Sequence, residues 1–178
     1  MSALIFPGQG SQLIGMGKEF YDNFELVKKI FKSADERLNF PISKIILEGP
    51  EDKLQLTKNT QPAILTVSYS IFRVLQQEFK FDFKNFKYFA GHSLGEYSAL
   101  VASDALSLED AVSLVNKRGK LMQTAVPEGI GAMLAVTEIM PTPPLLLNSK
   151  ASPSSPVSWI NSGPNFFIVW SSLFKSPV

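Results

Sequence analysis

A candidate nucleophilic serine and the only histidine in the chain stand side by side in the pentapeptide Gly91-His92-Ser93-Leu94-Gly95. This segment fits the pattern G-x-S-x-G, in which a sharp turn from a strand to a helix exposes a reactive serine. Such a serine needs a base to accept its proton, and histidine is the usual choice. His92 is a poor candidate for that base, because neighbouring side chains on a sharp turn tend to point apart. The sequence therefore predicts a nucleophile without its expected partner.

The residues around the pentapeptide predict the strand and the helix that such a turn requires. Phe86 to Ala90 reads as a strand, and the residues that follow the turn have a helical pattern. Gly91 and Gly95 are small residues at positions where the backbones must approach closely. The serine would then lie at the N-terminus of a helix. There the backbone N–H of Leu94 can face an oxyanion, helped by the helix dipole.

Strand and helix signals alternate along the first 140 residues and predict an α/β protein with a parallel sheet. Asp22 and Asn23 are candidate N-caps, and Ser107 with Asp110 resembles a capping box. The number of strands is low for a sheet covered on both sides, so the fold looks unfinished at Met140. The other expected elements are a buried strand from Ala3 to Phe6, helices to about Leu38, over Pro41–Leu47, from Pro62 to about Phe79 and from Ser107 to about Ala125, and a strand that starts near Gly129.

Composition and charge exclude several classes of function. The 178 residues are 45% hydrophobic and carry a formal net charge of +1, which indicates a globular protein without a nucleic-acid groove or an anionic membrane surface as its partner. The absence of cysteine and the single histidine argue against disulfides and metal sites. The N-terminal apolar run is too short for a signal sequence, and no stretch is long enough to span a membrane. We therefore expect a soluble cytoplasmic protein.

The composition changes near Met140. Residues 1–140 contain every acidic residue, whereas residues 141–178 contain seven of the twelve prolines and both tryptophans. This tail is either a Pro/Ser-rich linker that ends in a sticky strand, Phe166 to Trp170, or sequence never selected for this fold, such as the product of a shifted reading frame. The second interpretation is favoured, because interaction tails rarely lack acidic residues and still carry two tryptophans.

Several other residues have both a functional and an ordinary interpretation. The loop Gly8-Gln9-Gly10 lacks the third glycine of a dinucleotide fingerprint, since Leu13 stands in its place. It is either an ordinary turn or a source of a backbone N–H beside the serine, because loops at the carboxyl ends of parallel strands gather at one edge. Arg118 is either a solvated helix cation or a bidentate ligand for a carboxylate. Gln61 reads as a capping residue. His92 either shapes the site or is a partly buried residue with a satisfied ring.

Jointly, several segments make the sequence similar to the malonyl-CoA:acyl carrier protein transacylases of fatty-acid synthesis and the related acyltransferase domains of polyketide synthases. The likeness covers about residues 1–137, and the segments occur in the family's order. The matching segments are FPGQGSQ at 6–12, TQPA at 60–63, GHSLGEYSAL at 91–100, KRGKLMQ at 117–123, VPEG at 126–129 and GAM at 131–133.

The resemblance implies a role for each candidate residue. Ser93 would attack the malonyl thioester of coenzyme A and carry the malonyl group as an ester. The backbone N–H groups of Gln9 and Leu94 would form the oxyanion hole, and Arg118 would hold the malonyl carboxylate. The phosphopantetheine thiol of acyl carrier protein would then accept the malonyl group. Family members need no metal and no cofactor, and we expect a monomer.

The remaining candidates and the departures from the family lead to a further expectation. Gln61 would line the site, and His92 would be a neighbour of the serine rather than its base. The resemblance implies that the catalytic histidine, the later strands of the hydrolase-like subdomain and nearly all of the ferredoxin-like subdomain are missing. We therefore expect a transacylase truncated or frame-shifted after about residue 137, with residues 138–178 disordered or non-native. Such a chain would be inactive alone, since losing a triad member costs on the order of 10⁴–10⁶ in kcat.

Two other functions remain open on the sequence. A serine esterase or thioesterase would use the same nucleophile but would have no need of Arg118. A non-catalytic remnant that docks acyl carrier protein would form no adduct on Ser93.

Overall fold

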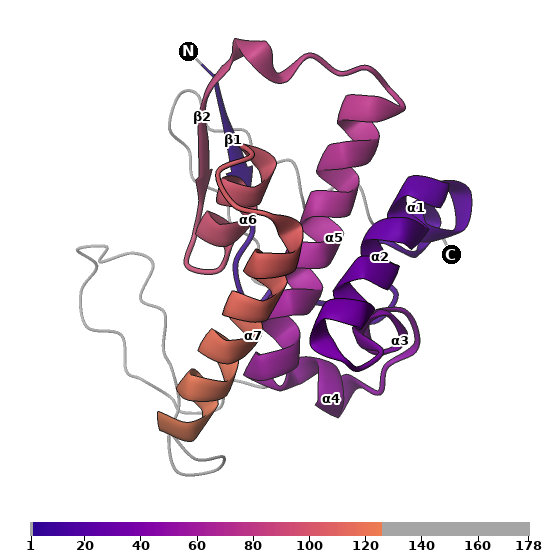
Figure 1. The fold of residues 1–178 in the computed structure, drawn as a ribbon, viewed down its shortest axis with the longest axis vertical. Coiled ribbons are helices and arrows are strands. Elements are labelled where there is room, and N and C mark those ends of the chain that lie inside the picture. Colours follow the sequence, from indigo (N-terminus) through magenta and orange to yellow (C-terminus); the bar gives the residue numbers. More distant parts are fainter. Residues whose placement is uncertain (1, 126–178) are drawn as a thin grey trace, which may run out of the picture. The chain divides into compact units, whose positions relative to one another are not determined.

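A computed structural model of the chain describes residues 2–125 (Figure 1). The strand predicted from Gly129 and the whole of the Pro/Ser-rich tail lie outside the described residues. In chain order the elements are β1 (Ser2–Phe6), α1 (Lys18–Asn23), α2 (Glu25–Leu38), α3 (Ile42–Glu48), α4 (Glu51–Gln55), α5 (Thr57–Gln77), the short 3₁₀ helix η1 (Phe83–Asn85), β2 (Phe86–Gly91), α6 (Gly95–Ala102) and α7 (Leu108–Ala125).

Helix α5 lies at the centre of the described part, with the two strands and α6 on one side and α1 to α3 on the other (Figure 1). It contacts every one of the other six α-helices. Ala63, Leu65 and Val74 are completely buried as a result. A helix that is surrounded in this way is buried on all its faces rather than along one stripe. The central helix therefore fixes where its neighbours can lie.

The strands β1 and β2 pair in parallel, as predicted. Their register places Phe6 opposite Gly91, so both strands end at the same level. The loops that leave the two strands therefore start side by side. The expectation that β1 is buried is wrong except at its end, because Ser2, Ala3 and Ile5 are exposed and only Phe6 is buried. Among the described residues the sheet has two strands and is packed on one face, so alternate side chains point to solvent.

An aromatic cluster fills the space between the sheet, α5 and α6. Phe72 of α5 is its centre: its ring lies 6.3 Å from that of Phe6, 4.6 Å from that of Phe83 and 6.0 Å from that of Phe89, measured between centroids. Edge-on and tilted pairs at these distances are favourable beyond the burial of their area. The cluster holds the ends of both strands against α5, which is what positions the loops that follow them.

Two predicted helix boundaries are wrong. Asp22 and Asn23 end α1 rather than capping α2, whose N-cap position is taken by Phe24. Helix α5 begins at Thr57 rather than at Pro62, so the proline lies inside the helix. One of the two hydrogen bonds of the predicted capping box of α7 forms: the backbone N–H of Asp110 donates to the hydroxyl of Ser107 over 3.1 Å.

Helix α5 tolerates Pro62 because a side chain of α7 replaces the missing hydrogen bond. A proline has no N–H, so the carbonyl four residues earlier loses its helical donor. That carbonyl belongs to Lys58, and it accepts instead from Nδ2 of Asn116 over 2.8 Å. The two helices are therefore joined at the point where α5 is locally incomplete.

The same two helices make a close backbone contact at Gly119. A Cβ at this position would lie 2.6 Å from the carbonyl oxygen of Thr57 and 2.7 Å from Cα of Lys58. Both atoms belong to the backbone and cannot rotate away. Only glycine therefore allows α7 to lie this close to the start of α5.

We expect Gly119→Ala to lower the free energy of unfolding by about 1–3 kcal/mol, because the added methyl forces the helices apart. The measurement is urea denaturation followed by circular dichroism. Alanine raises helix propensity by about 1 kcal/mol over glycine, so an unchanged or raised stability would show that the contact is not close. The exposed Lys117→Ala, in the same turn of α7, is the control and should change stability by no more than about 0.5 kcal/mol.

Candidate active site

Ser93 lies on a tight turn between β2 and α6. The strand ends at Gly91 and the helix begins at Gly95, and Ser93 between them has a φ of 55°, in the left-handed region. The turn is closed by the N–H of Gly95, which donates to the carbonyl of His92 over 2.9 Å. A non-glycine residue held in this region costs of order 1–3 kcal/mol. The surrounding structure therefore forces the serine into a conformation that it would not adopt alone.

Two glycines make this turn sterically feasible. A Cβ on Gly91 would lie 2.0 Å from the carbonyl carbon of Gly95, and a Cβ on Gly95 would lie 2.3 Å from the carbonyl oxygen of Phe6. The start of α6 is thus pressed against the ends of both strands. The first N–H groups of a helix have no intrahelical partner, and Leu94 immediately precedes that first turn. Its side chain is completely buried, which anchors this end of the helix.

The loop after β1 lies against the serine turn, as predicted from the parallel sheet. A Cβ on Gly8 would lie 2.5 Å from the carbonyl oxygen of His92, so the two backbones are in contact. The loop is held by its own residues, since the hydroxyl of Ser11 donates to the carbonyl of Gly8 over 2.9 Å. The side chain of Gln9 is exposed and its Nε2 donates to the hydroxyl of Thr57, at the start of α5, over 3.3 Å.

Arg118 points at the serine rather than into solvent. Its Nη2 donates to Oγ of Ser93 over 3.0 Å, and its Nη1 donates to Oε1 of Gln61 over 2.7 Å. Its guanidinium also lies 5.6 Å from the centroid of the Tyr97 ring, within the range of a cation–π contact. The arginine therefore joins α5, α6 and α7 at one point, and both ends of its planar fork are held.

Gln61 is fully buried inside α5 and is not a capping residue, so that interpretation is wrong. Its Nε2 lies 3.2 Å from the sulfur of Met122, one turn beyond Arg118 on α7. Sequence reasoning missed both Met122 and Tyr97 as neighbours of the site. The available signal was spacing. Met122 lies four residues after Arg118 and shares its helix face, and Tyr97 lies four residues after Ser93, in the first turn of the helix that follows it.

His92 is exposed, so the expectation of a partly buried ring is wrong. Within residues 2–125, the hydroxyl of Ser93 has Arg118 as its hydrogen-bond partner and forms no bond with His92. Both the carbonyl and the ring of His92 lie against Gly8, since a Cβ there would be 2.5 Å from the carbonyl oxygen and 3.1 Å from Nδ1. The geometry thus agrees with the sequence argument that neighbouring side chains on this turn diverge.

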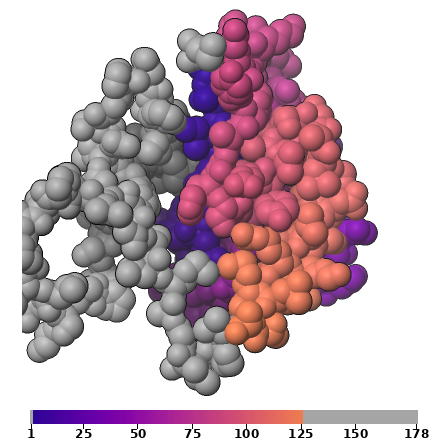
Figure 2. Space-filling model, turned by 90° about the vertical axis from the view of Figure 1, so that its left-hand side faces the viewer, coloured from indigo at the N-terminus to yellow at the C-terminus, as the bar shows by residue number. Residues whose placement is uncertain are grey.

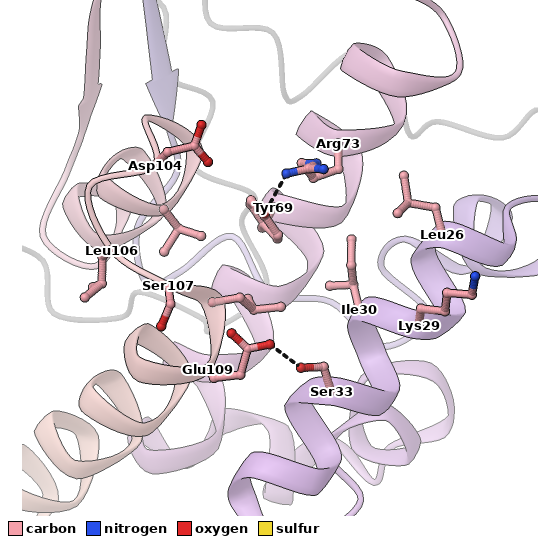
Figure 3. Close-up of a pocket in the computed structure, with 12 residues that line it drawn as sticks. Leu26, Lys29, Ile30, Ser33, Tyr69, Arg73, Asp104, Leu106, Ser107 and Glu109 are labelled. Atoms are coloured by element: carbon pink, nitrogen blue, oxygen red, sulfur yellow. Dashed lines mark hydrogen bonds between the residues drawn. The ribbon is translucent and has the colours of Figure 1, made fainter.

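A surface pocket of about 480 Å³ lies elsewhere, between α2, α5 and the start of α7 (Figure 3). None of the predicted site residues lines it. Two of the charged side chains that line it have partners: Arg73 donates to the hydroxyl of Tyr69 over 3.0 Å, and Glu109 accepts from the hydroxyl of Ser33 over 2.8 Å. The predicted site residues therefore lie at the turn at the ends of the strands and not in this pocket. The helices α6 and α7, which flank the predicted site residues, are in contact, and their surfaces adjoin in Figure 2.

Two further properties bear on the kind of site. Within residues 2–125, no cluster of three or more histidine, aspartate or glutamate side chains could share a metal ion. None of the helices in the same range is both long enough and apolar enough to cross a bilayer.

The model of the acyl transferase domain family matches residues 3–159 of the sequence. The chain belongs to this family. The chain is 52% identical over 134 residues to the malonyl CoA-acyl carrier protein transacylase of Bacillus subtilis (strain 168), a match that covers 75% of this chain and 41% of the relative. It is 46% identical over 134 residues to the transacylase of the same name from Haemophilus influenzae, covering 75% and 42% of the two chains.

Solved structures of relatives agree with this family membership. The chain is similar to the acyl-carrier-protein-S-malonyltransferase of Bartonella henselae with a TM-score of 0.67 and 48% identity, over 71% of this chain and 40% of the other. It is also similar to a malonyl-transacylase solved in complex with its type II PKS acyl-carrier protein, with a TM-score of 0.66 and 46% identity over 71% and 40% of the chains. The chain thus shares its α/β fold with malonyltransferases, and it spans about two fifths of their length. The boundary predicted near residue 137 stays a prediction.

We expect Ser93→Gly to be more stable than Ser93→Ala by about 1 kcal/mol, because only glycine adopts the left-handed conformation without steric cost. Both variants remove the same hydroxyl and its bond to Arg118, so the comparison isolates the backbone. Chemical denaturation of the two variants measures the difference. Equal stabilities would show that the backbone at Ser93 is not strained.

Proposed function

We propose that this chain carries the nucleophile of a malonyl-CoA:acyl carrier protein transacylase. The observation that best supports it is the contact of Arg118 with Ser93, because the guanidinium lies where the free carboxylate of a malonyl ester on that serine would reach. An arginine fork binds a carboxylate through two parallel hydrogen bonds. An acetyl group has no such carboxylate, so this arrangement selects a dicarboxylic acyl group over a simple one. The named relatives support the same acyl group.

The turn at Ser93 acts in this proposal as a nucleophile elbow. The hydroxyl oxygen forms a bond to the malonyl carbonyl carbon, the bond from that carbon to the sulfur of coenzyme A breaks, and the thiol leaves with a proton. The backbone N–H groups of Gln9 and Leu94 stabilise the negative charge that develops on the carbonyl oxygen. Their support is the contact between the two loops, at Gly8 and His92, which brings both segments to one edge of the sheet.

Gln61 and Met122 support the site without reacting. The buried amide of Gln61 holds one end of the arginine fork, so the other end stays directed at Ser93. A malonyl carboxylate would replace the serine hydroxyl and accept two parallel bonds, from Nη2 and from Nε on the same edge of the guanidinium. Gln61 thus lines the site in the sense that the family resemblance implies.

The second half of the reaction passes the malonyl group to acyl carrier protein. The thiol of its phosphopantetheine arm attacks the ester carbon, the bond to Ser93 breaks, and the hydroxyl regains a proton. Acyl carrier protein as the partner is supported by the transacylase solved in complex with one. The chemistry needs neither a metal nor a cofactor, because proton transfer and oxyanion stabilisation suffice.

The proton of Ser93 needs an acceptor other than His92, which is exposed and forms no bond with the hydroxyl. The sequence contains no second histidine. We therefore propose that the purified 178-residue chain forms the malonyl ester slowly, on the order of 10⁴-fold below the rate with a positioned base. Residual reactivity comes from the oxyanion donors and Arg118.

Intact-mass spectrometry after long incubation with malonyl-CoA tests the proposal. We expect one malonyl adduct, absent in Ser93→Ala, and faster labelling by malonyl-CoA than by acetyl-CoA. Arg118→Ala should lower the ratio of the malonyl-CoA to the acetyl-CoA labelling rate about tenfold or more, because the carboxylate loses its charged partner. Lys117→Ala, its exposed neighbour, should keep the preference.

Three other outcomes would contradict the proposal in different ways. Release of the free acid without transfer to holo-acyl carrier protein, with Arg118→Ala fully active, would indicate a serine esterase or thioesterase. No adduct at any time, with acyl carrier protein still bound, would indicate a docking remnant. Labelling at an ordinary enzyme rate would show that a group in this chain accepts the proton.

A further inference from the structure

The first turn of α5 is the point to which the parts of the candidate site are tied. The hydroxyl of Thr57 accepts from the side chain of Gln9, on the loop that supplies a proposed oxyanion donor. The carbonyl of Lys58 accepts from Asn116, and Oε1 of Gln61 accepts from Arg118. These three acceptors fall within five consecutive residues, Thr57 to Gln61, of one helix. The loop that carries Gln9 and the side chain of Arg118 are therefore both held in place by the same short segment.

Apart from the bonds that Gln61 makes with Arg118 and Met122, one contact between α7 and this segment is directional, the bond from Asn116 to the carbonyl of Lys58. Gly119 packs on Thr57 and Lys58 without a side chain, so van der Waals contact alone would let the helices slide past each other. The bond from Asn116 to the Lys58 carbonyl does not allow sliding, because it weakens steeply when its angle changes. Asn116 is only 6% exposed, so water cannot readily replace it.

We infer that Asn116 is a positioning residue that sets where Arg118 lies over Ser93. The position of Arg118 does not depend on the proposed function. The expected consequence of that position, a preference for a malonyl group, rests on the proposed function. Asn116 fixes the register of α7 along α5 by satisfying the carbonyl that Pro62 leaves without a donor. Arg118 is two residues further along the same rigid helix, so its reach to Gln61 and Ser93 follows from that register.

The geometry is tested with the 178-residue chain by NMR of the arginine Nε–H groups, with the Arg118 signal assigned through Arg118→Lys. We expect Asn116→Ala and the nearly isosteric Asn116→Leu both to shift this signal. We also expect each to lower the unfolding temperature by about 3–6 °C, since the carbonyl of Lys58 loses its partner. The exposed Lys117→Ala should change neither. Agreement between Ala and Leu would show that the lost donor, rather than lost volume, is responsible.

Pro62→Ala separates a positioning role of Asn116 from the mere satisfaction of a carbonyl. Alanine at this position has an N–H that can donate to the Lys58 carbonyl within the helix, as in any regular turn. In the Pro62→Ala background, Asn116→Ala should therefore cost less stability but should still shift the Arg118 signal, because the bond between α7 and the Lys58 carbonyl is still missing. An unshifted Arg118 signal in that double variant, or no shift on Asn116→Ala alone, would overturn the inference.

Calorimetric affinities for malonyl-CoA and acetyl-CoA test the consequence. We expect the affinity ratio to fall about tenfold in Asn116→Ala and to stay low in the double variant with Pro62→Ala, because the two-pronged bond to the carboxylate depends on the alignment that the Asn116 bond provides. A ratio unchanged in Asn116→Ala despite a shifted Arg118 signal would overturn the positioning role. A wild-type chain that binds both thioesters equally would contradict the proposed function, while the NMR and unfolding measurements would still decide the geometry.

Discussion

The close approach of α7 to the first turn of α5 is the constraint on which the site depends. It requires a residue without a side chain at Gly119 and a donor for the carbonyl of Lys58. With both present, the arginine of one helix and the glutamine of the other meet inside the protein and are directed at Ser93. The guanidinium is held by bonds in a fixed plane, so little rearrangement is needed when a carboxylate arrives.

The serine turn illustrates a second constraint, namely that strain at one residue is supported by many. The left-handed backbone of Ser93 is kept in place by the buried side chain of Leu94 and by backbone contacts that tolerate only glycine at two positions. Beneath them the aromatic cluster around Phe72 joins the strand ends to α5. The free energy that holds Ser93 in this conformation therefore comes from the core rather than from the turn itself.

Much of the fold and the placement of the serine could be predicted from the sequence, and the failures have physical causes. The strands, the α3 helix and the turn were predictable because local patterns and glycines determine them. The start of α5 was not, since Pro62 is a helix-start signal unless a distant side chain such as Asn116 satisfies the freed carbonyl. The contact of Arg118 with the serine likewise depends on how helices pack, and only the family resemblance pointed to it. Periodicity also could not show that Ile5 is exposed, because exposure depends on what covers the sheet.

The level ending of the two strands has a consequence for how the site tolerates sequence change. The pairing of Phe6 with Gly91 is made by main-chain atoms, which every amino acid except proline provides in full. Exchanges of exposed side chains along either strand, away from Phe6 and Gly91, therefore leave the spacing between the two loops intact, whereas slipping one strand by a single residue would turn Phe6 out of the core. The distance between the loops that follow β1 and β2 is thus set by the backbone hydrogen bonds of the sheet, and the burial of Phe6 keeps the register fixed.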